Sequence, residues 1–318
     1  VRRAVALAVA LLSLAGLTRC TAPGGALAVR DGHLVDGQGR SILLRGINYP
    51  FGWYAWRTDT AQQFAAMKAT GANSVRVVLN AGRYGPPTTP AEVSTAVSLC
   101  QAQRMLCILE VHDTTGYGES GDARTLSQAA DYVLSVKDRL IGLESFVIVN
   151  IGNEPFGNNQ TANANWARDT IGAVRKLRDG GLTHTLMVDG PGWGQDDRGL
   201  MRDQAPSVWA VDQNLIFSVH MYEVYSPANR ARIGEYLSSF TSRKLPVIVG
   251  EFGPSNNGNP VDVDEILAYT QTHGIGWLGW SWSGNSNPGG CCSPLDMVRD
   301  FDVTPSGRLS WGNRLIDG

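Results

Sequence analysis

The chain lacks an excess of charge of either sign. Its 27 lysines and arginines face 29 aspartates and glutamates, which gives a net charge of −2 at pH 7. Arg2, Arg3 and Arg19 lie in the first 28 residues, and without them 24 basic residues stand against 29 acidic ones, a difference of −5. A nucleic-acid-binding domain normally carries a basic patch or stripe. The charge content therefore gives no indication of a nucleic-acid partner.

Long apolar runs are also missing, except at the N-terminus. Arg2 and Arg3 are followed by an apolar run over residues 4–17 and by an A-x-A pattern at residues 26–28. These are the three parts of a secretory signal peptide. The run has ~14 residues, fewer than the roughly 20 of a membrane-spanning helix. We expect a signal peptide over residues 1–28 and a secreted, extracellular mature protein that begins near Val29 and has no membrane attachment.

Cysteine is scarce, with five residues in the chain. Cys20 lies in the signal segment, and Arg19 directly before it argues against a lipid anchor, because such signals have a small residue there. The remaining four are Cys100, Cys107, Cys291 and Cys292. An even number in an exported chain favours disulfides, and Cys100–Cys107 is the plausible local bridge. Its counterpart would be a strained ring between adjacent cysteines, so two other connectivities stay open.

Motifs of several common enzyme classes are absent. The chain has no G-x-S-x-G elbow, no phosphate- or dinucleotide-binding glycine loop and no H-E-x-x-H pattern. A metal site could be imagined from His112, Asp113, His220 and Glu251, but no metal-ligand spacing connects them. No feature of the sequence calls for a cofactor or a bound metal.

What the chain does contain is a regular alternation of short apolar runs and amphipathic segments. The runs, rich in valine, isoleucine and leucine, are residues 42–47, 74–79, 106–111, 146–151, 185–189, 216–221, 247–251 and 275–280. The helix-like segments between them include residues 60–69, 90–102, 126–140, 165–178, 229–242 and 261–273. Eight strand and helix pairs predict a (β/α)8 TIM barrel in a single domain, residues 29–318, rather than an open sheet. The residues before Ile42 are expected to form a small hairpin at the bottom of the barrel.

Polar residues stand at the ends of these apolar runs, where a barrel of this type builds its active site. The set consists of Arg76, His112, Asn153, Glu154, His220, Tyr222, Glu251 and Trp280. Any one of them alone could be a strand cap or a buried polar pair. So many on one rim would be costly unless they were paired or used, because buried polar groups need partners. The rim is therefore the candidate active site.

Two carboxylates at separate strand ends are what cleavage of a glycosidic bond requires. We expect Glu154 to be the general acid/base, with a pKa raised by burial near a second carboxylate. Glu251 is the expected nucleophile, and it must stay ionised. Arg76 is its natural partner, since a nearby guanidinium favours the charged carboxylate.

The other polar residues of the rim suit supporting roles. Tyr222 is expected to donate a hydrogen bond to the nucleophile. Asn153 would bond to the 2-hydroxyl of the sugar, an interaction that strengthens in the transition state. His112 and His220 are suited to hold sugar hydroxyls and to orient the glutamates, and Trp280 offers a flat apolar face.

This set of residues resembles the recurrent set of glycoside hydrolase family five, and none of that set is missing. Within the family, four strings resemble bacterial endo-β-1,4-mannanases: LEVHDTTGYGE at 109–119, NIGNEPFGN at 150–158, GWGQD at 192–196 and GWSWSGN at 279–285. The adjacent cysteines at 291–292 depart from the pattern. The resemblance covers nearly all of the mature chain. It implies endo-acting cleavage of β-1,4-mannosidic bonds in mannan, glucomannan or galactomannan, with retention through a covalent intermediate on Glu251, by a monomer.

Three further tryptophans and two other functions stay open. Trp53, Trp193 and Trp282 are candidates for outer sugar subsites, because sugar faces stack on indoles, and core packing is an equally open role for each. An endo-β-1,4-glucanase of the same family is the nearest other function, since sequence strings do not fix recognition of the 2-hydroxyl. A catalytically inactive glycan-binding barrel is the second, and the intact Glu154 and Glu251 argue against it.

Overall fold

The computed structural model describes residues 25–285 and 292–317. Within them, eight parallel strands close into a barrel in the order β12-β3-β4-β5-β6-β7-β8-β9. The strands are β3 (Arg45–Tyr49), β4 (Ser74–Leu79), β5 (Leu106–Val111), β6 (Val147–Asn150), β7 (Thr185–Asp189), β8 (Leu215–Met221), β9 (Val247–Phe252) and β12 (Gly276–Gly279). The predicted (β/α)8 barrel is confirmed.

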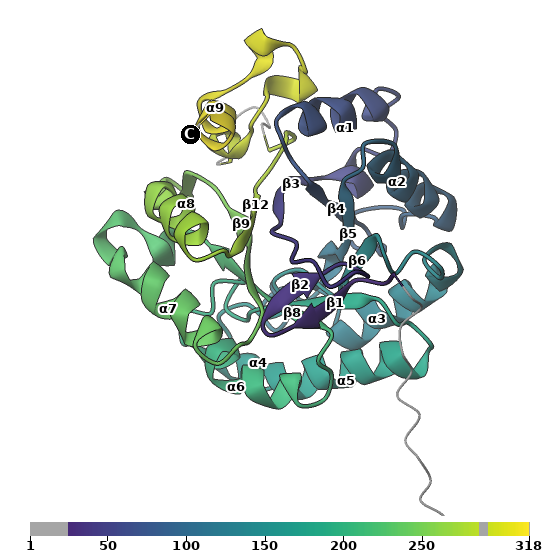
Figure 1. Cartoon of the computed structure of the whole chain (residues 1–318), viewed down its shortest axis with the longest axis vertical. Coiled ribbons are helices and arrows are strands. Elements are labelled where there is room, and N and C mark those ends of the chain that lie inside the picture. Colours follow the sequence, from purple (N-terminus) through teal and green to yellow (C-terminus); the bar gives the residue numbers. More distant parts are fainter. Residues whose placement is uncertain (1–24, 286–291, 318) are drawn as a thin grey trace, which may run out of the picture.

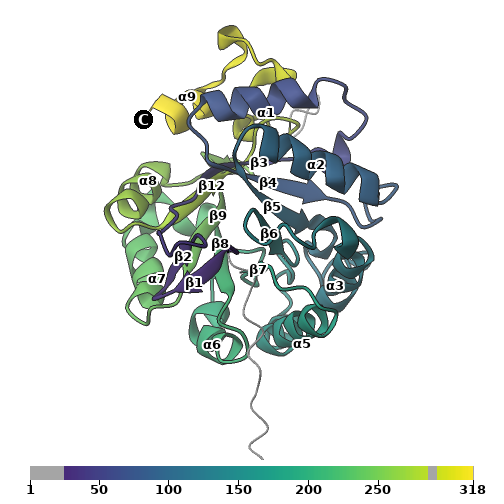
Figure 2. The ribbon, with the colours of Figure 1, turned by 45° about the vertical axis from the view of Figure 1, so that its right-hand side comes forward.

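Helices form a ring outside the strands (Figure 2). They are α1 (Thr60–Ala69), α2 (Pro90–Ala102), α3 (Leu126–Ser135), α4 (Gln160–Asn163), α5 (Trp166–Asp179), α6 (Leu200–Trp209), α7 (Ala231–Thr241), α8 (Val263–Thr272) and α9 (Ser310–Asp317). Short 3-10 turns are η1 (Phe51–Trp53), η2 (His112–Thr114), η3 (Lys137–Arg139), η4 (Glu223–Tyr225), η5 (Pro227–Asn229), η6 (Ser293–Leu295), η7 (Arg299–Phe301) and η8 (Pro305–Gly307). A hairpin of two two-residue strands, β10 (Ser255–Asn256) and β11 (Asn259–Pro260), follows β9.

Local signals explain why several helices begin where the sequence predicts. Thr89 caps α2 in a capping box with Glu92, and Thr125 caps α3 in the same way with Gln128. Each cap satisfies backbone N–H groups that have no partner inside the helix. The sequence pattern gave no sign of α6, which carries Pro206 in its interior, a residue that normally ends a helix.

The barrel strands are buried over most of their length, and the partly exposed residues lie at their starts. All six residues of β4 and all five of β7 are buried, because helices cover one face and the barrel interior the other. Their bounds, and those of β5, are the predicted ones. The first strand begins three residues later than predicted, at Arg45, because the preceding Leu44 packs below the barrel with the residues of its floor.

The predicted N-terminal hairpin is confirmed and closes the bottom of the barrel. It consists of β1 (Ala28–Arg30) and β2 (His33–Val35), which pair antiparallel and lie across the barrel in Figure 1. Asp31 and Gly32 make the turn with positive φ angles of 49° and 83°, as a two-residue hairpin loop requires. The side chains that fill the floor come from this segment and from the starts of the barrel strands: Leu27, Leu34, Leu44, Ile108, Ile148, Met187, Ile216, Ile248 and Leu278.

Two predictions about export lie largely outside the described residues. The apolar run of the expected signal peptide falls in residues 1–24, and among the residues that are described no helix is long and apolar enough to cross a membrane.

Cys100 and Cys107 are both buried and free, without a bond between them, and they lie close enough to interact through their side chains. The predicted bridge between them is not formed in this structure. Cys291 lies outside the described residues, so its pairing is untested.

The packing of Leu27, just before the hairpin, predicts where the folded domain begins. Leu27 is 1% exposed, and its backbone N–H donates to the carbonyl of Glu144 at 2.9 Å. A chain that starts at Val29 loses this side chain from the floor, at a cost of about 2 kcal/mol. We expect its midpoint of thermal unfolding to fall roughly 5 °C below that of a chain starting at Gly25.

The matched control is Leu27→Ala in the longer chain, which should reproduce most of the loss. Equal unfolding temperatures for the two starting points would show that the segment before Val29 does not contribute to the barrel floor.

Candidate active site

A cavity of about 510 Å³ opens among the carboxyl ends of the barrel strands and the loops that follow them. Both predicted catalytic glutamates, Glu154 and Glu251, line this cavity. The other predicted residues in its wall are His112, Asn153, Trp193, Tyr222 and Trp280. Residues far apart in the chain therefore meet on one rim, as the sequence predicts.

Arg76 of β4 lies beneath this cavity, with no exposed surface. Its guanidinium donates hydrogen bonds to five side chains: Asn48 at 3.0 Å, Asn150 at 2.8 Å, Asn153 at 2.8 Å, Asp189 at 3.1 Å and Glu251 at 2.6 Å. Burial disfavours the charged form, but the carboxylates of Glu110, Asp189 and Glu251 outweigh it and raise the pKa of Arg76. A permanent positive charge is thus fixed at the centre of the barrel.

Glu251 of β9 is held at both carboxylate oxygens. Oε1 accepts the 2.6 Å hydrogen bond from Arg76, and Oε2 accepts one of 2.9 Å from the hydroxyl of Tyr222. Burial and the charge of Glu251 hold the pKa of Tyr222 well above its ordinary value, so the phenol keeps its proton and donates. These two contacts fix the direction in which the carboxylate of Glu251 points.

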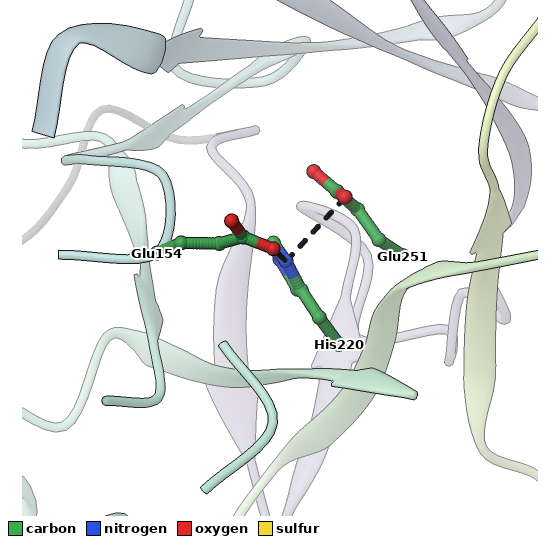
Figure 3. A group of neighbouring side chains, drawn as sticks. All are labelled: Glu154, His220 and Glu251. Carbon is green, nitrogen blue, oxygen red and sulfur yellow. Dashed lines mark hydrogen bonds and ion pairs between the residues drawn. The ribbon is translucent and has the colours of Figure 1, made fainter. Parts of the chain in front are cut away.

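Glu154 follows β6 and faces Glu251 across the cavity (Figure 3). Its backbone has a positive φ of 40°, and its N–H donates to Asp189 Oδ2 at 3.3 Å. Burial raises the pKa of Glu154 above its ordinary value, the charge of Glu251 raises it further, and the contact with His220 opposes the rise. Glu154 is therefore prepared to carry a proton, while Glu251 accepts hydrogen bonds at both of its carboxylate oxygens.

His220 of β8 stands between the two glutamates. Nδ1 lies 2.9 Å from Glu154 Oε1 and 3.5 Å from Glu251 Oε2. An irregular register between β8 and β9 at Val219 and His220 places the imidazole there. The loop after β7 supports it from behind, where the backbone N–H of His220 donates to the carbonyl of Gly194 at 2.9 Å. A side chain in place of Gly194 would strike the ring, since an added Cβ would lie 2.6 Å from it.

His112 follows β5 and sits among aromatic rings. Its Nδ1 lies 3.1 Å from Glu110 Oε1, and although burial lowers the pKa of His112, the charge of Glu110 outweighs it and raises that pKa. The ring stacks on Trp280 with centroids 5.8 Å apart and meets Trp53 edge-on at 4.7 Å. The peptide bond between Trp280 and Ser281 is cis.

Asp113, next to His112 in the sequence, points away from the cavity. Its two carboxylate oxygens accept hydrogen bonds of 2.7 Å each from the backbone N–H groups of Ala81 and Arg83. It anchors the loop after β4 and is not available to a ligand in the cavity.

Comparison with known proteins identifies the family. Residues 35–286 match the family model described as cellulase (glycosyl hydrolase family 5). The chain belongs to glycosyl hydrolase family 5. It is 48% identical over 314 residues to a mannan endo-1,4-beta-mannosidase of Streptomyces lividans, covering 97% of this chain and 78% of that one. It is 44% identical over 318 residues to a mannan endo-1,4-beta-mannosidase of Cellvibrio japonicus, covering 99% of this chain and 71% of that one.

A solved structure described as the mannohexaose complex of the beta-mannanase of Thermomonospora fusca is also similar. The TM-score is 0.84 at 44% sequence identity, with 91% of this chain and 93% of that one covered. The family resemblance drawn from the strand-end residues is confirmed.

Family 5 enzymes are retaining, and the carboxyl groups fit that outcome. A carboxylate oxygen of Glu154, a ring nitrogen of His220 and a carboxylate oxygen of Glu251 all lie within 4.8 Å of one another. Retaining glycosidases hold their carboxyl groups about 5–5.5 Å apart, whereas inverting ones leave about 6.5–9.5 Å for a water molecule. Glu251 is therefore close enough to attack the anomeric carbon of a sugar whose glycosidic oxygen is protonated by Glu154.

The three additional tryptophans differ in position. Trp193, in the loop after β7, lines the cavity. Trp53 lies beside this cavity and lines an adjoining hollow of about 670 Å³. Trp282 is 2% exposed, and its Nε1 donates to Gln63 Oε1 at 2.7 Å. Of the two roles open for Trp282, its burial and its hydrogen bond to Gln63 support packing in the barrel wall.

Four buried polar residues beneath the cavity were missing from the sequence-based set: Asn48, Glu110, Asn150 and Asp189. All are fully or almost fully buried and contact Arg76. Asp189, which ends an apolar run, and Asn48, which directly follows one, could have been found from that position. Glu110 and Asn150 lie inside their predicted apolar runs, where a polar residue has no distinguishing pattern.

The contrast between Trp193 and Trp282 gives a paired prediction. Trp193→Ala should raise the KM for a polysaccharide about fivefold, because stacking on an indole contributes roughly 1 kcal/mol to binding, and should leave thermal stability nearly unchanged. Trp282→Phe should leave KM unchanged and lower the unfolding temperature by about 5 °C, since it opens space in the wall and removes a partner of Gln63.

Steady-state kinetics and thermal unfolding of both variants check this. A raised KM in Trp282→Phe with unchanged stability would reverse the assignment of that residue to packing.

Proposed function

We propose that the protein is an endo-β-1,4-mannanase that cleaves internal bonds of mannan, glucomannan or galactomannan with retention of configuration. The observation that carries the proposal is the pair of carboxylates within 4.8 Å, one bound by Arg76 and one beside His220. The mannan specificity is supported by the relatives named mannan endo-1,4-beta-mannosidase and by the mannohexaose complex of a similar structure.

In the first step Glu251 attacks the anomeric carbon of the sugar while Glu154 gives its proton to the glycosidic oxygen. The bond from the anomeric carbon to that oxygen breaks, and an ester between the sugar and Glu251 forms. Arg76 and Tyr222 hold the nucleophile in line, so little reorganisation is needed when charge moves from its oxygen to the sugar.

In the second step Glu154, now a carboxylate, takes a proton from a water molecule. The water oxygen attacks the anomeric carbon, the ester bond breaks, and Glu251 is released as a carboxylate. His220 lies 2.9 Å from Glu154 in the free protein, where it can stabilise the carboxylate between the two steps. Two displacements at one carbon restore the original configuration.

The surroundings of the cavity suit a long chain rather than a single sugar. Trp53 stands between the cavity and the adjoining hollow, with its ring centroid 6.3 Å from that of Trp280 and 5.7 Å from that of Tyr84. Trp56, 74% exposed, and Tyr84, 44% exposed, also line the hollow. Exposed aromatic faces offer stacking sites for further sugars of a chain, which supports internal cleavage.

We also propose that the protein is secreted and acts as a monomer on extracellular β-mannan. The basic and apolar pattern of residues 1–28 supports secretion.

Substitution of the two glutamates separates their roles. Glu251→Ala should abolish turnover and be rescued by azide. The azide would attack from the side where the Glu251 carboxylate stood and give a product of inverted configuration. Glu154→Ala should lose roughly 100- to 10,000-fold on mannan yet keep cleaving aryl glycosides with good leaving groups, because those need no acid. Product configuration by NMR and rates on both substrates check the assignment. Full activity of either variant on mannan would contradict it.

The substrate is tested by reducing-end release from linear β-1,4-mannan and from a soluble cellulose derivative, with Glu154→Gln and Glu251→Gln as blanks. We expect rapid release from mannan and little from cellulose. Release mainly from cellulose would keep the mechanism and replace mannan by glucan. No release from either would indicate a glycan-binding barrel without turnover.

A further inference from the structure

Asp189 is a buried carboxylate at the end of β7 that the mechanism above leaves without a role. It is 2% exposed and does not line the cavity. Four groups from neighbouring strands surround it: His220 Nε2 at 3.2 Å, Arg76 at 3.1 Å, the side-chain amide of Asn150 at 3.0 Å and the backbone N–H of Glu154 at 3.3 Å. All of its neighbours are donors or cations, so the residue acts as an anion.

The imidazole of His220 lies between Asp189 on one side and the glutamates on the other. Nε2 lies 3.2 Å from Asp189 Oδ2. Nδ1 faces Glu154 and Glu251 (Figure 3). The contact at Nε2 has the distance of an ion pair without the alignment of a hydrogen bond. Its effect is therefore that of charge, which does not depend on a narrow angle.

We propose that Asp189 is a positioning residue that keeps His220 in its doubly protonated, charged form and thereby sets the pH at which Glu154 gives up its proton. The inference rests on the proposed role of Glu154 as acid/base. With both ring nitrogens protonated, His220 can only donate to Glu154. The donated hydrogen bond is strongest when Glu154 has become a carboxylate, which is its state between the two displacements.

The charges on every side of His220 agree with this state. Glu154 follows β6, Asp189 ends β7 and Glu251 lies on β9, and the one cation among the close neighbours, Arg76 of β4, is itself bonded to Asp189 and Glu251. Burial lowers the pKa of His220, but the charges of Glu251 and Asp189 outweigh it and raise that pKa to about 10. Burial would raise the pKa of Asp189, but His220 and Arg76 hold it at about 2.

Asp189→Asn tests the proposal, because it removes one charge and keeps the shape. The active free protein has Glu154 protonated, so kcat/KM falls as the pH rises through the pKa of Glu154. With one negative charge fewer, the protons shared by Glu154 and His220 leave at lower pH. We expect the basic limb of the kcat/KM profile to move to lower pH by about one unit.

Asn150→Ala is the matched control for a merely structural effect. Asn150 is also fully buried and bonds to both Asp189 and Arg76, but it carries no charge. It should lose stability and leave the basic limb in place. An unmoved limb in Asp189→Asn, a shift to higher pH, or an equal shift in Asn150→Ala would each overturn the proposal.

A second measurement does not depend on activity, and its wild-type part does not depend on the folding of a variant. In ¹⁵N NMR of the wild-type chain, which has five histidines, His220 should keep the signature of an imidazolium up to pH 8 and above. In Asp189→Asn it should lose that signature at lower pH. A neutral His220 at pH 7 in the wild type overturns the inference even if the protein hydrolyses mannan. A protein that cleaves no glycan but shows the imidazolium would overturn the proposed function and leave the Asp189–His220 pair standing.

Discussion

The buried guanidinium of Arg76 is the constraint on which the rest of the site depends. A cation without exposed surface is costly unless anions and acceptors surround it closely. Its partners come from four barrel strands, β3, β6, β7 and β9, or from residues that follow them: Asn48, Asn150, Asn153, Asp189 and Glu251. Since these strands lie on different parts of the wall, the charge at the centre fixes the strand ends relative to one another, and with them the distance between Glu154 and Glu251.

The balance of charge around Arg76 explains which carboxylate carries the proton. The cluster contains four carboxylates and three bases: Glu110, Glu154, Asp189 and Glu251 against Arg76, His112 and His220. With all three bases charged, neutrality requires one proton on a carboxylate. Among the described ion pairs, Arg76 contacts every one of the four except Glu154. Glu154 is therefore the group on which the proton costs least, and burial raises its pKa accordingly.

Much of this could be predicted from the sequence, because barrel strands buried on both faces appear as continuous apolar runs with a polar end. That pattern gave the bounds of β4 and β7 and placed both glutamates at the cavity. The pattern failed where a residue that packs in the core and a residue that acts in the site have the same type and position in the sequence. Trp282, like Trp280, is a tryptophan followed by serine, but it packs in the wall, and Glu110 lies inside its strand. Helix α6 was missed because Pro206 contradicts a helical pattern, and the rest of the barrel overrides that local preference.

The division between strands and loops separates chemistry from the choice of substrate. Arg76, Asp189 and His220 are buried in the barrel wall and bonded before any sugar arrives, so the orientation of the glutamates is established during folding. Replacing such a cluster by apolar side chains is often neutral or stabilising in other proteins, so its presence here is explained by catalysis and not by stability. Trp53 and Trp193 lie on loops, which can vary without disturbing that cluster. A change of preferred glycan therefore needs changes only in the loops, and the same buried charges would serve it.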